Sequence, residues 1–153
     1  MVFQKQLQKS VAKILKLSRK KRKFSGFTIG NTSKIDTKNY YFTPIRETEK
    51  IITSGVVLYS EYLAKKVAKF VDGKVDYVLV DAEKKISPKK DRSSDVWEPA
   101  NIERRVREVL KKSKLWIYKG NDLAVDAVDI LITFLTKSNI RGIGGKKVTI
   151  IGA

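Results

Sequence analysis

The chain has 153 residues, of which 42% are apolar, so it is long enough and apolar enough to fold around one core. It contains neither Cys nor His, which excludes a disulfide framework, thiol catalysis, the Ser-His and Cys-His nucleophile pairs and most zinc sites. The formal net charge is +17, and a field of this sign attracts polyanions such as nucleic acid, anionic membranes and phosphorylated cofactors. A chain rich in Lys and Glu and free of Cys is also typical of thermophilic proteins.

The first 24 residues are basic and contain no Asp or Glu. Between Val2 and Leu17 the apolar residues recur at the spacing of one helical face, and the basic cluster 19–23 follows. This segment predicts a basic amphipathic helix, for which two interpretations stay open. It is either an arm for nucleic acid or another anionic surface, or a helix packed on its own domain with its lysines in solvent. The packed helix is favoured, because an arm does not need this many apolar residues in register, namely Phe3, Leu7, Val11, Ile14 and Leu15.

Helices and strands alternate through the rest of the chain. Short β-prone pieces at 27–29 and 40–42 precede a long helix predicted over 47–71. Gly73 stands where a glycine typically ends such a helix. The elements predicted after it are a buried strand at 75–80, an exposed loop at 82–98, a helix at 100–112, a strand at 115–118, a helix at 123–137 and a final strand at 148–151.

From Glu47 onward, each connection between predicted strands has the length of a helix. This order predicts an α/β fold, with an open, mainly parallel sheet and helices on both faces (three layers), preceded by the basic N-terminal helix. Three parts are expected along the chain. They are a basic helix or arm at 1–24, an α/β domain at 25–138, and a linker with the first strand of a truncated dinucleotide-binding domain at 139–153.

The last of these expectations rests on the run G-K-K-V-T-I-I-G-A at 145–153. Dinucleotide-binding folds turn from a buried strand onto the phosphate through a first glycine, which Gly152 matches. With the helix at 123–137 before it, this run resembles the domain junction of amino-acid-dehydrogenase-like enzymes, a group that includes shikimate and methylene-tetrahydrofolate dehydrogenases. The resemblance implies the substrate-side domain of a dehydrogenase that interconverts a hydroxyl or amine and a carbonyl on a small polar metabolite. NAD or NADP would bind, through Gly152, only in a longer chain, and this chain alone would be inactive.

Ligands of open α/β sheets collect beyond the carboxyl ends of the strands, which are predicted here at Asp81 and at the turn 119–122. The shikimate dehydrogenase pattern pairs a Lys with an Asp, and its nearest counterparts, although the local motifs differ, are Lys84 or Lys85 with Asp122. These three are the candidates for proton transfer, because a Lys and an Asp tune each other's pKa. The candidates for substrate binding are Asn121, Asp81 and Lys119. The alternative is that both aspartates cap a turn or a helix while the lysines are solvated.

Two further patterns lie on predicted helices. Tyr62 and Lys66 are four residues apart, as in the Tyr-x-x-x-Lys motif of the folate enzymes, and this spacing places both on one helical face. Asp122, Asp126 and Asp129 form an acidic stripe. The stripe favours pairing with a neighbouring basic helix, and no metal site is predicted, because side chains on a helix surface converge poorly on one ion.

The alternative function is a complete basic α/β module that binds nucleic acid through the helix at 1–24 and the basic face at 104–112. Only charge supports it, since no recognised nucleic-acid motif is present. No stretch approaches the length of about 18 apolar residues that a membrane span needs, and the N-terminus lacks the apolar region of a signal peptide. A cytoplasmic location is therefore expected, and homodimerisation stays open.

Overall fold

The computed structural model describes residues 2–32, 40–58, 60–83, 101–145 and 147. The chain divides into two compact units, residues 1–119 and residues 120–153. The first unit contains, in chain order, α1 (Val2–Lys21), β1 (Phe24–Asn31), β2 (Tyr40–Glu47), β3 (Ile51–Leu58), α2 (Glu61–Val71), β4 (Tyr77–Asp81), α3 (Ile102–Arg107) and β5 (Lys114–Tyr118). The second unit contains α4 (Gly120–Thr136).

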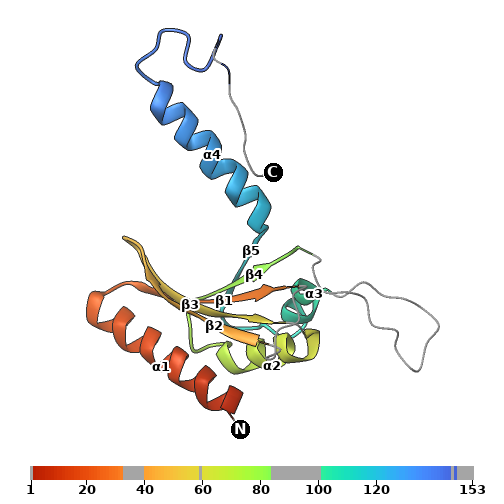
Figure 1. The fold of residues 1–153 in the computed structure, drawn as a ribbon. Helices are drawn as coiled ribbons and strands as arrows, with labels where there is room; N and C mark the ends of the chain where they lie inside the picture. Colours follow the sequence, from red (N-terminus) through yellow and green to blue (C-terminus); the bar gives the residue numbers. More distant parts are fainter. Residues whose placement is uncertain (1, 33–39, 59, 84–100, 146, 148–153) are drawn as a thin grey trace, which may run out of the picture. The chain divides into compact units, whose positions relative to one another are not determined.

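One five-stranded sheet forms the centre of the first unit, in the order β2-β3-β1-β4-β5 (Figure 1). Strands β3, β1, β4 and β5 are parallel, whereas the edge strand β2 pairs with β3 in the antiparallel sense. Helix α2 carries the chain from β3 past β1 to β4, and α3 connects β4 to β5. The predicted α/β class, the open and mainly parallel sheet and the basic N-terminal helix are confirmed.

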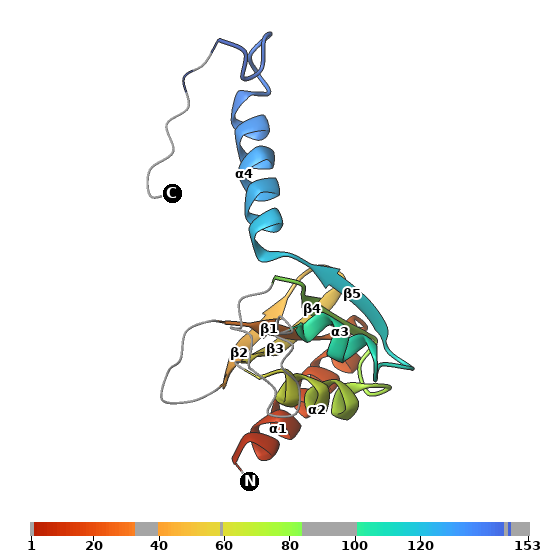
Figure 2. The same ribbon diagram turned by 90° about the vertical axis from the view of Figure 1, so that its right-hand side faces the viewer.

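The core of the first unit lies between one face of this sheet and its helices. Figures 1 and 2 both show α1 and α2 on the same side of the sheet. One continuous cluster joins Val11 of α1, Val67 of α2 and Val106 of α3 to Phe27 and Val78 of the strands, each at most 3% exposed. Residues 1–119, as far as they are described, therefore form two layers. The remaining described helix, α4, belongs to the second unit, so the predicted third layer stays a prediction.

The helix predicted over 47–71 is wrong in its first half, where residues 51–58 form β3. Helix α2 begins only at Glu61, after Ser60, whose side chain accepts a hydrogen bond from the Leu63 N–H as an N-cap. The apolar residues of β3 recur at a spacing that a helix also allows, but all except Leu58 are β-branched, and the strand pairs with β1 and β2 on either side. Gly55 suits the strand, because a Cβ there would lie 2.4 Å from the backbone oxygen of Thr28.

Other elements differ from the prediction in extent. β1 and β2 are eight-residue strands rather than short pieces, and Pro44 is accommodated in β2 because this strand lies at the sheet edge and shifts register between Thr43 and Arg46. Helix α3 is shorter than the predicted 100–112. Most of the predicted loop at 82–98 and the final strand at 148–151 lie outside the described residues.

Candidate functional site

Helix α1 has one buried apolar face and one exposed basic face. Leu7, Val11 and Ile14 are at most 3% exposed and belong to the core, which confirms that the helix packs on its own domain. The lysines of its outer face, Lys5, Lys9, Lys13 and Lys16, are exposed. None of these lysines forms an ion pair within the part of the chain that the structure describes. The helix thus keeps a row of uncompensated positive charges.

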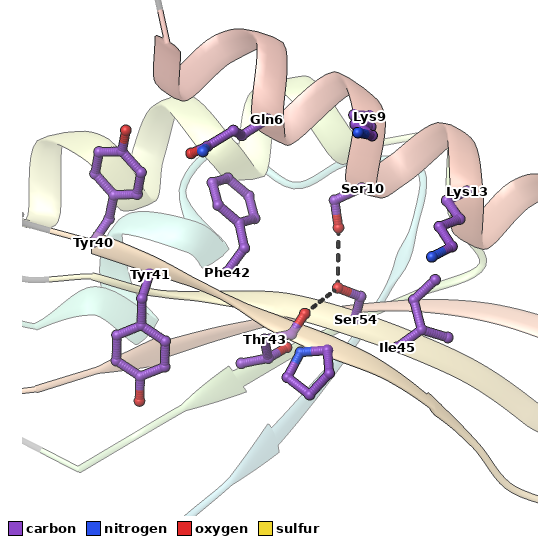
Figure 3. A pocket seen from close by; sticks show the side chains of 11 residues that line it. Gln6, Lys9, Ser10, Lys13, Tyr40, Tyr41, Phe42, Thr43, Ile45 and Ser54 are labelled. Carbon is purple, nitrogen blue, oxygen red and sulfur yellow. Dashed lines mark hydrogen bonds between the residues drawn. The ribbon is translucent and has the colours of Figure 1, made fainter.

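A groove of roughly 500 Å³ lies between α1 and the edge strand β2 (Figure 3). Lys9 and Lys13 line it from the helix, while Tyr40 and Phe42 point toward the helix from the strand. Tyr41 also lines the groove but projects to the opposite side of the strand. No Asp or Glu is among the described lining residues, which are Gln6, Lys9, Ser10, Lys13, Tyr40, Tyr41, Phe42, Thr43, Pro44, Ile45 and Ser54.

Two hydrogen bonds hold the two sides of this groove together. The Ser54 hydroxyl donates to the backbone oxygen of Thr43 at 2.9 Å and lies 3.0 Å from the Ser10 hydroxyl. Because the single proton of Ser54 is directed at Thr43, Ser10 is the donor to Ser54. The Phe3 ring of α1 packs edge-on against Tyr40, with ring centroids 4.6 Å apart. Helix α1 and strand β2 are thus linked by contacts within the protein itself.

The second basic face predicted from the sequence, at 104–112, is partly compensated by acids. Arg107 lies 2.5 Å from the Glu103 carboxylate. Arg105 lies 3.4 Å from Glu108 and 3.8 Å from Glu61. Exposed pairs of this kind add little to stability, but they lower the positive potential around α3. Of the two basic surfaces, the groove beside α1 is therefore the better site for a polyanion.

A polar cluster lies at the carboxyl ends of the parallel strands. Asp81 is 5% exposed and stands directly opposite Tyr118 in the neighbouring strand. Burial, with the negative charges of Asp81 and Glu83, raises the pKa of Tyr118 to about 12, so its phenol stays protonated and can donate. Asn31 donates to the backbone oxygen of Glu83, while its buried Oδ1 has no hydrogen-bond partner among the residues that the structure describes.

Of this cluster, only Asp81 was among the residues predicted from the sequence. Asn31 and Tyr118 were missed, although each is a polar residue that ends a strand and this signal would have found both. Lys119 ends the first unit, whereas Asn121 and Asp122 lie in the first turn of α4 in the second unit. The predicted pairing of Asp122 with Lys84 or Lys85 is not tested, because both lysines lie outside the described residues, as does Gly152.

Tyr62 and Lys66 do lie together on α2, as their spacing predicts. The Lys66 ammonium stands over the face of the Tyr62 ring, 4.3 Å from its centroid, and Tyr62 is 66% exposed. This is a surface cation–π contact. The arrangement places the ammonium on the ring and not at the hydroxyl, so it gives no support to an acid–base pair.

Comparisons of the chain with protein-family models, with curated proteins and with solved structures found no match. None of the helices described has the length and apolar character that crossing a membrane requires.

Proposed function

We propose that this protein is a basic α/β module that binds nucleic acid, with the groove between α1 and β2 as its phosphate-binding site. The observation that carries the proposal is that Lys9 and Lys13 line this groove without an acidic neighbour among its lining residues. Phosphate neutralisation by lysines releases condensed counterions, which is the main source of sequence-independent affinity. The net charge of +17 supplies attraction toward the same partner from further away.

Charge reversal in the groove tests this proposal. In the Lys9→Glu/Lys13→Glu double variant, affinity for an oligonucleotide should fall at least tenfold, because two phosphate contacts become repulsive. The slope of log affinity against log salt should also become shallower, by about 0.7 for each lost contact to a single strand. Fluorescence anisotropy over a series of salt concentrations measures both quantities.

The matched control is the Lys66→Glu/Lys69→Glu double variant, which makes the same change of charge on the exposed surface of α2. It should retain affinity within about threefold. Equal losses in the two variants would show that only net charge matters and would remove the groove from the proposal. Absence of binding by the wild-type protein at low salt would remove the function itself.

A second candidate is the substrate-side domain of an NAD- or NADP-dependent dehydrogenase, with the cofactor held by a longer chain. It is favoured by the buried Oδ1 of Asn31, which has no hydrogen-bond partner among the described residues, at the strand ends where Asp81 and a protonated Tyr118 lie on the other face of the sheet. Acceptors of this kind suit the hydroxyl groups of a small polar metabolite. Shikimate is the probe for this site: calorimetric titration should show binding that Asn31→Leu removes. No heat of binding with the wild-type protein argues against a shikimate-type site.

A further inference from the structure

One face of the sheet is left open by the helices that the structure describes in residues 1–119. Strand residues alternate between the two faces, and partners in register share a face. Phe27, Ser54 and Val78 are in register and face the helical layer. The alternate positions therefore form the opposite face, among them Phe24 of β1, Tyr41 and Arg46 of β2, Tyr77 of β4, and Lys114 and Trp116 of β5.

Large aromatic side chains on this open face are exposed. Phe24 is 53%, Tyr41 56% and Trp116 60% exposed. Tyr77 connects two of them, with ring centroids 5.6 Å from Phe24 and 6.4 Å from Trp116. Parallel sheets are normally covered on both faces, so an aromatic surface of this extent marks a site of interaction.

The centre of the open face contains three glycines. Gly26, Gly30 and Gly55 occupy it on the neighbouring strands β1 and β3. A Cβ at Gly26 would lie 2.9 Å from side-chain atoms of Ile51 and Thr53, so the surrounding side chains already close over this position. The three glycines add no side chain of their own between the exposed rings, which suits a planar ligand better than the ridges of a helix.

Cations stand at both edges of the same face. One row of residues in register crosses all five strands, with Arg46 at the β2 edge and Lys114 at the β5 edge. Both are exposed, and neither forms an ion pair within the described residues. The one carboxylate among the strand residues of this face, Asp81, is 5% exposed. The surface is thus complementary to a ligand that has planar apolar rings and negative charges.

We infer that the open face binds single-stranded nucleic acid, with bases stacked on Tyr41 and Trp116 and phosphates near Arg46 and Lys114. This inference rests on the proposed function and narrows it, because the bases of a duplex are stacked on each other and do not offer their faces to a protein. Base stacking on aromatic side chains contributes to affinity without regard to sequence. Tyr41 also lines the basic groove, so a strand held by Lys9 and Lys13 reaches the open face by crossing β2.

Two oligomers of equal length separate stacking from charge. One is a run of about 15 thymidines, near the upper end of the site sizes typical of single-strand-binding folds. The other has the same phosphate backbone without bases. The protein carries Trp97→Phe, which leaves Trp116 as the single tryptophan of the two in the sequence. Binding of the thymidine oligomer should quench the fluorescence of Trp116, whereas the abasic oligomer should bind at least fivefold more weakly and leave that fluorescence unchanged.

Substitutions at Trp116, made with Trp97 intact, then identify the stacking contact. Trp116→Leu keeps an apolar side chain but removes the ring, so it should weaken thymidine binding at least fivefold and leave abasic binding unchanged. Trp116→Phe should restore most of the affinity. Tyr62→Ala removes an equally exposed ring from α2 and should have no effect on either oligomer.

The failures of the two proposals are distinguishable. If neither oligomer binds the wild-type protein, the nucleic-acid function is wrong. If both oligomers bind equally, Trp116→Leu has no effect and charge reversal at Lys9 and Lys13 still weakens binding at least tenfold, the function stands and the stacking face is wrong. If light scattering shows a dimer that Trp116→Leu converts to a monomer, the open face is instead an interface between two copies, which also overturns the inference.

Discussion

At the scale of single residues, Asp72 shows how one carboxylate joins two distant segments. It follows α2, and its side chain accepts hydrogen bonds from the backbone N–H groups of Lys111, Lys112 and Ser113 at 2.8 to 3.0 Å. Partial burial acts to raise the pKa of Asp72, but these hydrogen bonds outweigh it and hold the pKa below its usual value of 3.8. The ionised side chain therefore fixes the turn that leads into β5.

Replacing Asp72 by Asn should lower the free energy of unfolding by about 1–2 kcal/mol at pH 7, a reduced value for hydrogen bonds to a partly exposed charge. A folded-state pKa below the unfolded value means that the stabilisation is complete above pH 3.8 and is lost as the pH falls through the folded-state pKa. Urea titrations should therefore show that the difference in unfolding free energy between wild type and variant narrows below about pH 4.

Asp129→Asn, on the exposed surface of α4, is the control and should change stability by less than about 0.5 kcal/mol. A gap that stays constant with pH would contradict the role of the carboxylate.

At the scale of elements, α1 combines a structural role on one face with the proposed binding role on the other. Its apolar face contributes Leu7, Val11 and Ile14 to the core, while Lys9 and Lys13 line the groove. Deletion of residues 1–24 would remove both contributions together. Charge reversal on the outer face separates them, because it leaves the buried residues in place.

Ile14→Ala should lower the free energy of unfolding by about 2–5 kcal/mol, because Ile14 is fully buried and its removal leaves a cavity. Lys16→Ala, two residues further along on the exposed face, should change it by less than about 0.5 kcal/mol. Chemical denaturation followed by circular dichroism measures both. If Ile14→Ala costs less than about 1 kcal/mol, α1 is not an integral part of the core and the fixed groove beside it loses its basis.

Between residues 47 and 71, β3 shows where an element cannot be assigned from a sequence alone. Its apolar residues satisfy helical spacing, and most of them are also β-branched, so the local pattern is compatible with both a helix and a strand. Pairing decided the outcome: β3 hydrogen-bonds with both β1 and β2. Only a glycine fits at position 55, because any side chain there would clash with the backbone oxygen of Thr28. The spacing of apolar residues within one segment does not show which strands will pair with that segment.

At the scale of the whole molecule, the net charge of +17 determines how strongly a polyanion is attracted, whereas the ion pairs determine which part of the surface keeps its positive charge. The total charge brings any polyanion toward the protein and makes binding sensitive to salt. The position at which a polyanion would bind depends on which Lys and Arg side chains lack an acidic partner. Arg105 and Arg107 have acidic neighbours, whereas Lys9 and Lys13 have none among the groove residues.

The sequence by itself determined the α/β class and the mainly parallel sheet, because periodicity reports which residues avoid water. It favoured a packed N-terminal helix but left the arm as an open alternative. The net charge, which is a sum over residues, is the basis in the sequence for the proposed polyanionic partner. The tertiary structure alone decided that α1 packs on the core, that β3 is a strand, that Asp81 and Tyr118 stand opposite each other at the carboxyl ends of the strands, and that Tyr41 and Trp116 share the open face of the sheet. Strand order and register set these juxtapositions, and both depend on contacts between residues far apart in the chain.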